Sequence, residues 1–187
     1  MTEKIYYNQL KKEWGNVPTP YIISGKSWYW DYRDYTDKLA KENNLQLSQT
    51  CGIFSALSPL KSVEENKKLC ENVIIKRKYR GHTKRQLNKV KCIIVEKEVE
   101  KIDLILNGLK TVNFFRNIYS PWDKNYVTVD RHMIKLCHKG KEVLITPKRY
   151  KLMANAIKKL ANEVNLYPSE CQSVLWFQAK SLYGNNI

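Results

Sequence analysis

The sequence predicts an all-α fold, and three observations point to it. Turn-forming residues are scarce, with seven glycines and six prolines among 187 residues. Apolar side chains recur at spacings of three and four over long stretches, which is the period of a helix. Ser62-x-x-Glu65 and Thr83-x-x-Gln86 have the form of helix-capping signatures. We therefore expect roughly eight to ten helices and almost no sheet.

In the first half of the chain, turn signals divide the helical patterns. We expect helices over 1–14, 28–43, 47–57, from Ser62 to about 77, and from Thr83 to the mid-nineties. The segment 15–27 contains Pro18, Pro20 and Gly25 and is predicted to be a loop. Ser58-Pro59 breaks the chain, because the residue before a proline avoids helical geometry.

The second half follows the same logic. We expect helices over about 98–106, 110–119 and 130–137, then one that opens at Thr146-Pro147 and a last one from Pro168 to Gly184. The helix after Thr146 has apolar residues at 150, 153, 154, 157, 160, 161 and 164, which form a one-faced stripe. Residues 120–125 read as a loop. Residues 126–129 are extended and β-branched, and one short strand segment is predicted there.

Length and composition favour one domain over 1–187, built as two small lobes, with the aromatic N-terminal helices of 1–45 packed on the core. No run of about 18 uncharged apolar residues is present, so we expect no membrane span. Met1 to Lys4 shows no apolar signal segment. We accordingly expect an intracellular, cytoplasmic protein, which includes a viral protein inside a host cell, and a monomer.

The five cysteines, at positions 51, 70, 92, 137 and 171, are widely separated. None forms a C-x-x-C pair, so we expect neither a zinc nor an iron–sulfur site. Dispersed single cysteines are typical of reduced core residues in a cytosolic protein.

The net charge of +15, from 33 basic and 18 acidic side chains, favours a polyanionic partner. Nucleic acid is the leading candidate, an anionic membrane surface is the rival, and a merely lysine-rich protein is the third interpretation. Six of the cations fall within 76–85, at Lys76, Arg77, Lys78, Arg80, Lys84 and Arg85. This segment is either a turn that follows phosphates or an ordinary solvated connection.

Lys110 stands at the start of a predicted helix, directly after the turn signal Asn107-Gly108. A helix N-terminus can hold a phosphate and disfavours an ammonium, so it should lower the pKa of this lysine. A lysine with a lowered pKa can act as an amine nucleophile and form a Schiff base. The alternative is a solvent-facing lysine in a first helical turn.

Asp130 follows the extended segment Val127 to Val129 and opens the next helix. As an ordinary N-cap it would be worth about 1 kcal/mol. As a functional group it could stabilise an oxocarbenium-like sugar, or activate a nucleophile, beside an extruded nucleotide. We predict that folding brings the Lys110 amine and the Asp130 carboxylate to the rim of one basic groove.

Together these segments resemble the helix-hairpin-helix DNA glycosylase superfamily. That superfamily has a hairpin of the form L-P-G-V-G-x-K-T-A-N, followed about twenty residues after its lysine by V-D-T-H. The present chain reads Gly108-Leu109-Lys110-Thr111-Val112-Asn113 and then Val129-Asp130-Arg131-His132. Weaker similarity at Ala56-Leu57-Ser58, over 84–96 and over 172–184 extends the resemblance to about 47–184.

The resemblance implies a two-lobed helical fold in which a hairpin, here about 98–119, grips double-stranded DNA. By position, Asp130 is the catalytic aspartate, and Lys110 is the Schiff-base lysine of members that also cut the strand. DNA contacts are then expected at Asn107, Gly108, Leu109, Thr111, Lys61, Arg77, Arg80 and Arg131. Trp28, Trp30 and Tyr32 are candidate walls of a base pocket, because aromatic rings stack on extruded bases. Packing of the N-terminal helices on the core is the alternative role for those three rings.

This chain departs from the family pattern in three places. Ile105-Leu106 stands where the family has Pro-Gly, or the hairpin is two residues shorter, which makes it degenerate. Pro59-Leu60-Lys61 replaces the region of the family's intercalating glutamine. The four-cysteine cluster that some members carry after the last helix is absent from this sequence.

Three functions are therefore open. The first is a base-excision DNA glycosylase, with or without AP-lyase activity, that acts on a flipped base, modified or not, and needs no metal or organic cofactor. The second is a group transferase that alters a base in DNA without removing it. The third is a non-catalytic DNA-binding factor, such as a phage or mobile-element protein. The reaction product, abasic site or altered base, separates the first two. Asp130→Asn separates a glycosylase, which loses turnover, from a binding protein, which is unaffected.

Overall fold

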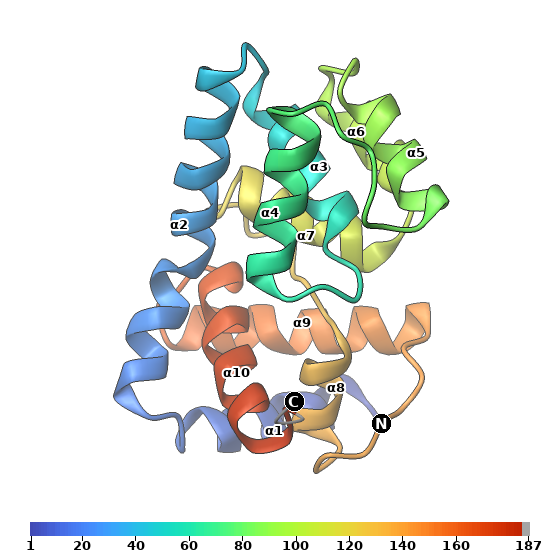
Figure 1. The fold of residues 1–187 in the computed structure, drawn as a ribbon. Helices are drawn as coiled ribbons and strands as arrows, with labels where there is room; N and C mark the ends of the chain where they lie inside the picture. Colours follow the sequence, from blue (N-terminus) through green and yellow to red (C-terminus); the bar gives the residue numbers. More distant parts are fainter. Residues whose placement is uncertain (185–187) are drawn as a thin grey trace. The chain divides into compact units, whose positions relative to one another are not determined.

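The computed structural model describes residues 1–184 and contains ten helices in that range (Figure 1). They are α1 (Glu3–Trp14), α2 (Thr19–Glu42), α3 (Leu47–Leu57), α4 (Val63–Ile74), α5 (Lys84–Ile93), α6 (Val99–Leu106), α7 (Leu109–Tyr119), α8 (Arg131–Cys137), α9 (Pro147–Glu163) and α10 (Pro168–Tyr183). No strand occurs among residues 1–184. The all-α prediction is confirmed.

The chain divides into two compact units. Unit 1 combines both ends of the sequence, Met1–Asp31 and Ser120–Ile187, and unit 2 is the continuous middle, Tyr32–Tyr119. The border falls within α2.

In unit 1 the core lies among α1, α8, α9 and α10. The stripe predicted for α9 is buried at positions 150, 153, 154, 157, 160 and 161, while Val164 is half-buried. Thr146 caps α9 by accepting a hydrogen bond from Arg149 N–H at 3.2 Å. Pro147 occupies the first helical position, where no N–H is needed.

In unit 2 the central element is α3, whose residues 48–57 are all buried and which packs against α4, α5, α6 and α7. Gly52 permits this closeness, since a Cβ there would lie 2.8 Å from Ile102 Cγ2. The capping box predicted at Ser62 and Glu65 is present at the start of α4, and Thr83 accepts from Gln86 N–H at the start of α5.

The prediction of a loop over 15–27 is wrong. The helix α2 begins at Thr19, so Pro20 falls in the first turn, where its missing N–H costs nothing. Gly25 lies inside the helix because of packing: a Cβ there would stand 2.5 Å from Val174 Cα of α10. Ser173 Oγ donates a hydrogen bond to Gly25 O at 2.5 Å across the same contact.

The strand predicted at 126–129 is also wrong, although the segment is extended. Its backbone groups bond to a side chain. Tyr150 Oη accepts from Val129 N–H at 3.1 Å and donates to Val127 O at 2.8 Å. Burial raises the pKa of Tyr150, so the hydroxyl stays protonated and able to donate.

Candidate functional site

The turn between α6 and α7 consists of Asn107 and Gly108. Asn107 has φ 44, a left-handed conformation that asparagine tolerates better than most residues, and its N–H bonds to Asp103 O at 3.0 Å. The first hydrogen bond beyond the turn runs from Val112 N–H to Gly108 O at 2.9 Å. Ile105 and Leu106 lie in α6, so the turn is shorter than the one the family resemblance describes.

Side chains fix the two helices that flank this turn. Arg116 Nε of α7 donates to both carboxylate oxygens of Asp103 in α6, at 2.9 and 3.2 Å. Lys89 Nζ donates to Leu106 O at the end of α6. Ser55 Oγ of the buried α3 donates to Thr111 O at 2.7 Å. The turn itself is thus exposed, while hydrogen bonds from other side chains of unit 2 fix the helices on either side of it.

Asn107, Gly108, Leu109 and Lys110 are all exposed, and Thr111 is half-buried. The Thr111 hydroxyl donates to Gly108 O at 3.1 Å. Lys110 is the second residue of α7. The N–H groups of a first helical turn point along the axis and away from the helix, so this end can receive an anion.

Asp130 is buried, with 8% of its surface exposed, and caps α8. Its Oδ1 accepts from His132 N–H at 2.9 Å and from Met133 N–H at 3.1 Å. Its Oδ2 accepts from Trp176 Nε1 of α10 at 3.1 Å. A carboxylate offers about four acceptor positions, so three of them are occupied. The group is rigid, and its charge can act on a nearby cation without rearrangement.

His132 lies beside this carboxylate. Its ring is half-buried, 6.1 Å from the Trp176 ring in an edge-on arrangement, and its buried Nδ1 has no hydrogen-bond partner among residues 1–184. Burial lowers the pKa of His132, and the charge of Asp130 opposes that shift. The neutral ring is therefore favoured. Arg131, next in sequence, is exposed.

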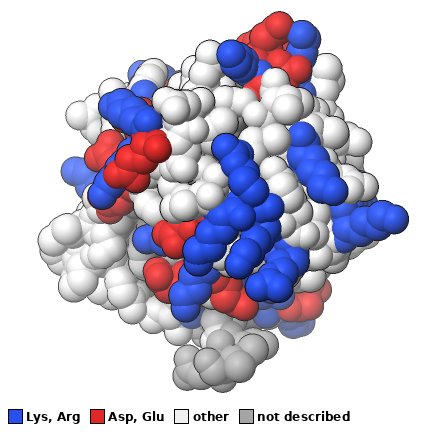
Figure 2. Space-filling view, turned by 45° about the horizontal axis from the view of Figure 1, so that its top comes forward, with Lys and Arg blue, Asp and Glu red and all other residues white. Residues whose placement is uncertain are grey.

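The basic residues of 76–85 occupy the connection between α4 and α5 and its junction with α5. All six cations are exposed, and Arg77 and Gly81 have positive φ angles of 53 and 89. His82 Nε2 pairs with Pro59 O at 3.1 Å, which ties this connection to the turn after α3. Figure 2 shows lysine and arginine side chains crowded together on part of the face drawn, with acidic side chains among them.

The turn after α3 exposes Leu60. This side chain is 89% exposed and has φ 61, a strained conformation for leucine. Lys61, which follows it, is half-buried, with Nζ 3.8 Å from Glu65 Oε1. Sequence reasoning did not assign Leu60 a role, because neither its strain nor its exposure leaves a pattern in the sequence.

The three candidate pocket walls lie in different surroundings. Trp28 is half-buried and packs on Tyr29 and Trp176, with centroids at 4.7 and 5.8 Å. Trp30 is half-buried near Trp122. Tyr32 is buried, 5.1 Å from the Phe54 ring, so it serves the core of unit 2. Packing thus accounts for Tyr32, and a role in base stacking at Trp28 and Trp30 stays a prediction.

Lys110 belongs to unit 2 and Asp130 to unit 1. Their predicted convergence on one groove therefore stays a prediction. Sequence reasoning did not foresee the Trp176 bond to Asp130, since 46 residues separate the two and no local pattern links them.

Residues 1–184 hold neither a metal-binding cluster nor a membrane-spanning helix. No group of three or more His, Cys, Asp and Glu side chains there is arranged to hold a metal ion. No helix in that range combines the length and apolar character needed to cross a bilayer. Of the five cysteines, which are all free, four are buried as expected, but Cys92 of α5 is exposed.

No curated protein and no solved structure shows significant similarity to this chain. One family model, described as a family of unknown function (DUF7178), matches residues 1–182. That match covers nearly all of the sequence, including the α6–α7 turn and Asp130, and the chain therefore belongs to the DUF7178 family.

Proposed function

We propose that this protein binds double-stranded DNA and excises a base from a nucleotide rotated out of the duplex. The observation that carries this is the pair α6 and α7, joined by a two-residue turn that exposes Lys110, with a buried aspartate at the head of α8 twenty residues later.

Binding to the DNA backbone would use the α6–α7 turn and basic side chains. The turn at Asn107 and Gly108 is exposed and leads into the first N–H groups of α7, which suit a phosphate oxygen. Further contacts come from the exposed Arg77, Arg80, Arg131 and Leu109 and from the half-buried Lys61 and Thr111. The net charge of +15 supplies the non-specific part of the affinity.

Leu60 is the proposed wedge. Proteins that kink or open a duplex insert an apolar side chain between base steps. Leu60 is 89% exposed on a turn that His82 fixes through Pro59 O, and Lys61 and the 76–85 cations lie on the same unit. An exposed apolar side chain held in a strained conformation beside cations fits this task.

Asp130 supplies the charge for bond cleavage. The bond between C1′ and the base nitrogen breaks, the base leaves with the bonding electrons, and the sugar becomes oxocarbenium-like. The fixed Asp130 carboxylate stabilises that positive charge. Water then adds to C1′ and loses a proton, which leaves an abasic site.

Lys110 extends the reaction in a bifunctional enzyme. Its neutral amine, instead of water, adds to C1′ and forms an imine with the opened sugar. Loss of the C2′ proton then expels the 3′ phosphate by β-elimination, and hydrolysis of the imine regenerates the lysine.

A non-catalytic DNA-binding protein is the second candidate, and one observation favours it. Asp130 makes three hydrogen bonds to α8 and Trp176 and is only 8% exposed, as a purely structural cap would be. In that case the exposed turn and the basic connection would bind DNA without chemistry.

The test is borohydride trapping and base release on duplexes that carry uracil, oxidised, alkylated or hypermodified bases. Wild type, Asp130→Asn, Lys110→Ala and the exposed-lysine control Lys141→Ala are compared. A glycosylase releases a base, and Asp130→Asn abolishes release while DNA binding persists. A covalent adduct that Lys110→Ala removes and Lys141→Ala retains identifies the lyase.

Two outcomes contradict base excision. Duplex binding without release from any substrate supports the binding-only candidate. An intact but altered base supports group transfer. Release that Asp130→Asn leaves unchanged would show that the catalytic carboxylate lies elsewhere.

A further inference from the structure

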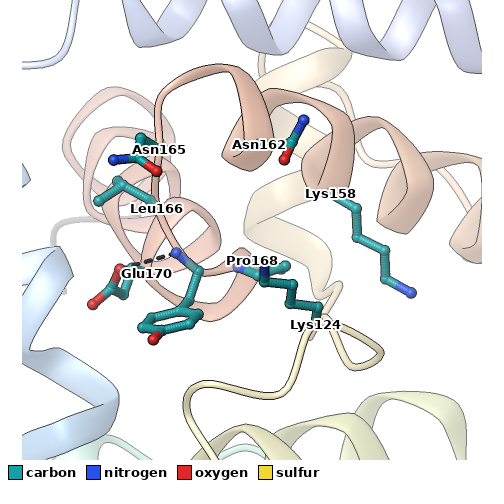
Figure 3. A pocket seen from close by; sticks show the side chains of 8 residues that line it. Lys124, Lys158, Asn162, Asn165, Leu166, Pro168 and Glu170 are labelled. Carbon is teal, nitrogen blue, oxygen red and sulfur yellow. Dashed lines mark hydrogen bonds between the residues drawn. The ribbon is translucent and has the colours of Figure 1, made fainter.

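Unit 1 contains a pocket of about 470 Å³ at the junction of α9 and α10 (Figure 3). It is lined by Lys124, Lys158, Asn162, Asn165, Leu166, Tyr167, Pro168 and Glu170. All eight residues lie in unit 1, and neither Asp130 nor the α6–α7 turn takes part. Its size falls in the range of small-molecule sites, about 300–1,000 Å³.

Hydrogen bonds hold the walls of this pocket in place. Lys158 Nζ donates to Asn125 O at 2.7 Å, and Ser169 Oγ donates to Pro121 O at 2.6 Å. These two bonds fix the loop that carries Lys124 against α9 and α10.

The charges that face the pocket are mainly positive. Lys124 and Lys158 contribute two ammonium groups, and Asn162 and Asn165 add amides that can donate or accept. Glu170 carries the one negative charge of the lining, and its oxygens are held by Trp30 Nε1 at 3.1 Å and Tyr167 N–H at 3.0 Å. Lys124 is exposed, and Lys158 keeps two further N–H donors beside its bond to Asn125 O, so both cations can also contact an anionic ligand.

An aromatic cluster borders the pocket. The Tyr167 ring lines it and is 37% exposed. The Trp30 ring lies 6.3 Å from Tyr167 and 5.7 Å from Trp122, which is 43% exposed. Exposed rings of this kind, backed by further aromatic packing, are platforms on which a base can stack.

We infer that this pocket binds a nucleotide unit, with its base stacked on Tyr167 and its phosphate between Lys124 and Lys158. The side chains of Asn162 and Asn165 then contact the base edge or the sugar. The nucleotide is either part of a single strand or free in solution, and the same chemistry recognises both. This inference does not depend on base excision, because it uses none of the residues proposed for that reaction.

The test is calorimetric titration of the full-length protein with thymidine monophosphate and, separately, with a short single-stranded oligothymidylate. Tyr167→Ala should weaken both affinities about tenfold, since stacking on one base is worth roughly 1–3 kcal/mol. Tyr167→Phe keeps the ring and should bind like wild type. Lys124→Ala should weaken binding several-fold, and Lys158→Gln, which can still donate to Asn125 O, should do the same.

Lys141→Ala is the control for loss of one exposed positive charge and should retain nucleotide binding. Much tighter binding of the oligonucleotide identifies a strand as the ligand, and equal binding identifies the free nucleotide. The inference is overturned if wild type binds neither probe, if Tyr167→Ala and Lys124→Ala bind like Lys141→Ala, or if inorganic phosphate binds as well as the nucleotide.

Discussion

The starts of α7 and α8 carry the two residues on which the proposed function rests, and these residues differ in exposure and in hydrogen bonding. At the head of α7, Lys110 is exposed and follows a two-residue turn. At the head of α8, Asp130 is 8% exposed and holds three donors. The first can meet a ligand with little effect on folding, whereas the second is part of the core. A loss of activity therefore means different things at the two positions.

The largest expected effect is on stability at Asp130. Asp130→Ala removes an N-cap and leaves the buried Met133 N–H and the half-buried Trp176 Nε1 without their acceptor. We expect a loss of about 2–3 kcal/mol in the free energy of unfolding, measured by urea denaturation. Lys110→Ala should change stability little, because its side chain is exposed. Equal losses of unfolding free energy in Asp130→Ala and Lys110→Ala would contradict the difference between a buried and an exposed residue.

The next effect concerns the support of the α6–α7 turn. Arg116→Met leaves the half-buried Asp103 carboxylate without its two-pronged partner. We expect a loss of about 1–2 kcal/mol, together with weaker duplex binding measured by fluorescence anisotropy. The control is Lys101→Met, which breaks an exposed pair with Glu98 and should alter neither quantity noticeably. Unchanged duplex binding by Arg116→Met would separate the turn from DNA recognition.

A smaller effect, with opposite signs in two assays, is expected at Leu60. Leu60→Gly relieves a left-handed conformation that costs leucine about 1–2 kcal/mol, partly offset by the greater freedom of glycine in the unfolded chain. We expect thermal stability to rise by about 0.5–1 kcal/mol and duplex distortion to fall, measured by 2-aminopurine fluorescence. Leu144→Gly, at a similarly exposed leucine without positive φ, should not stabilise the protein. A Leu60→Gly protein that distorts DNA normally would rule out the wedge.

The smallest effect is a pH dependence near α8. Burial holds the pKa of His132 below its ordinary value of 6.5, so the unfolded chain binds more protons than the folded one in this range. Stability should therefore fall as pH drops from above 6.5 toward the lower, folded-state pKa. His132→Gln should flatten that decline in urea unfolding series at several pH values. His138, whose pKa is also lowered by burial, contributes in the same direction, so His138→Gln is measured in parallel.

Local chemistry made much of the fold predictable. Capping residues such as Ser62 and Thr146 fix helix starts through contacts within a few residues. The apolar period of α9 marks the face of that helix that is buried. The failures came from long-range packing. Gly25 looks like a helix stop, but it is there to admit Val174, which is distant in the sequence. The extended segment before Asp130 looks like a strand, but a tyrosine hydroxyl bonds to its backbone.

The candidate site was predictable to the same extent. The sequence identified the exposed turn at Asn107 and Gly108 and the capping role open to Asp130, because both follow from neighbouring residues. It did not reveal the Trp176 bond, the strain at Leu60 or the pocket at Tyr167, because each depends on residues brought together only by folding.

The Tyr150 hydroxyl helps to orient the backbone that carries the Asp130 carboxylate. It contacts the backbone at Val127 and Val129, directly before Asp130, from a helix about twenty residues further along the chain. A single oxygen atom thus orients the extended segment before α8, a task for which another protein would use a whole neighbouring strand. A shift of α9 would move that oxygen and the segment bonded to it. Core substitutions in α9 could therefore change the position of the Asp130 carboxylate without contacting it.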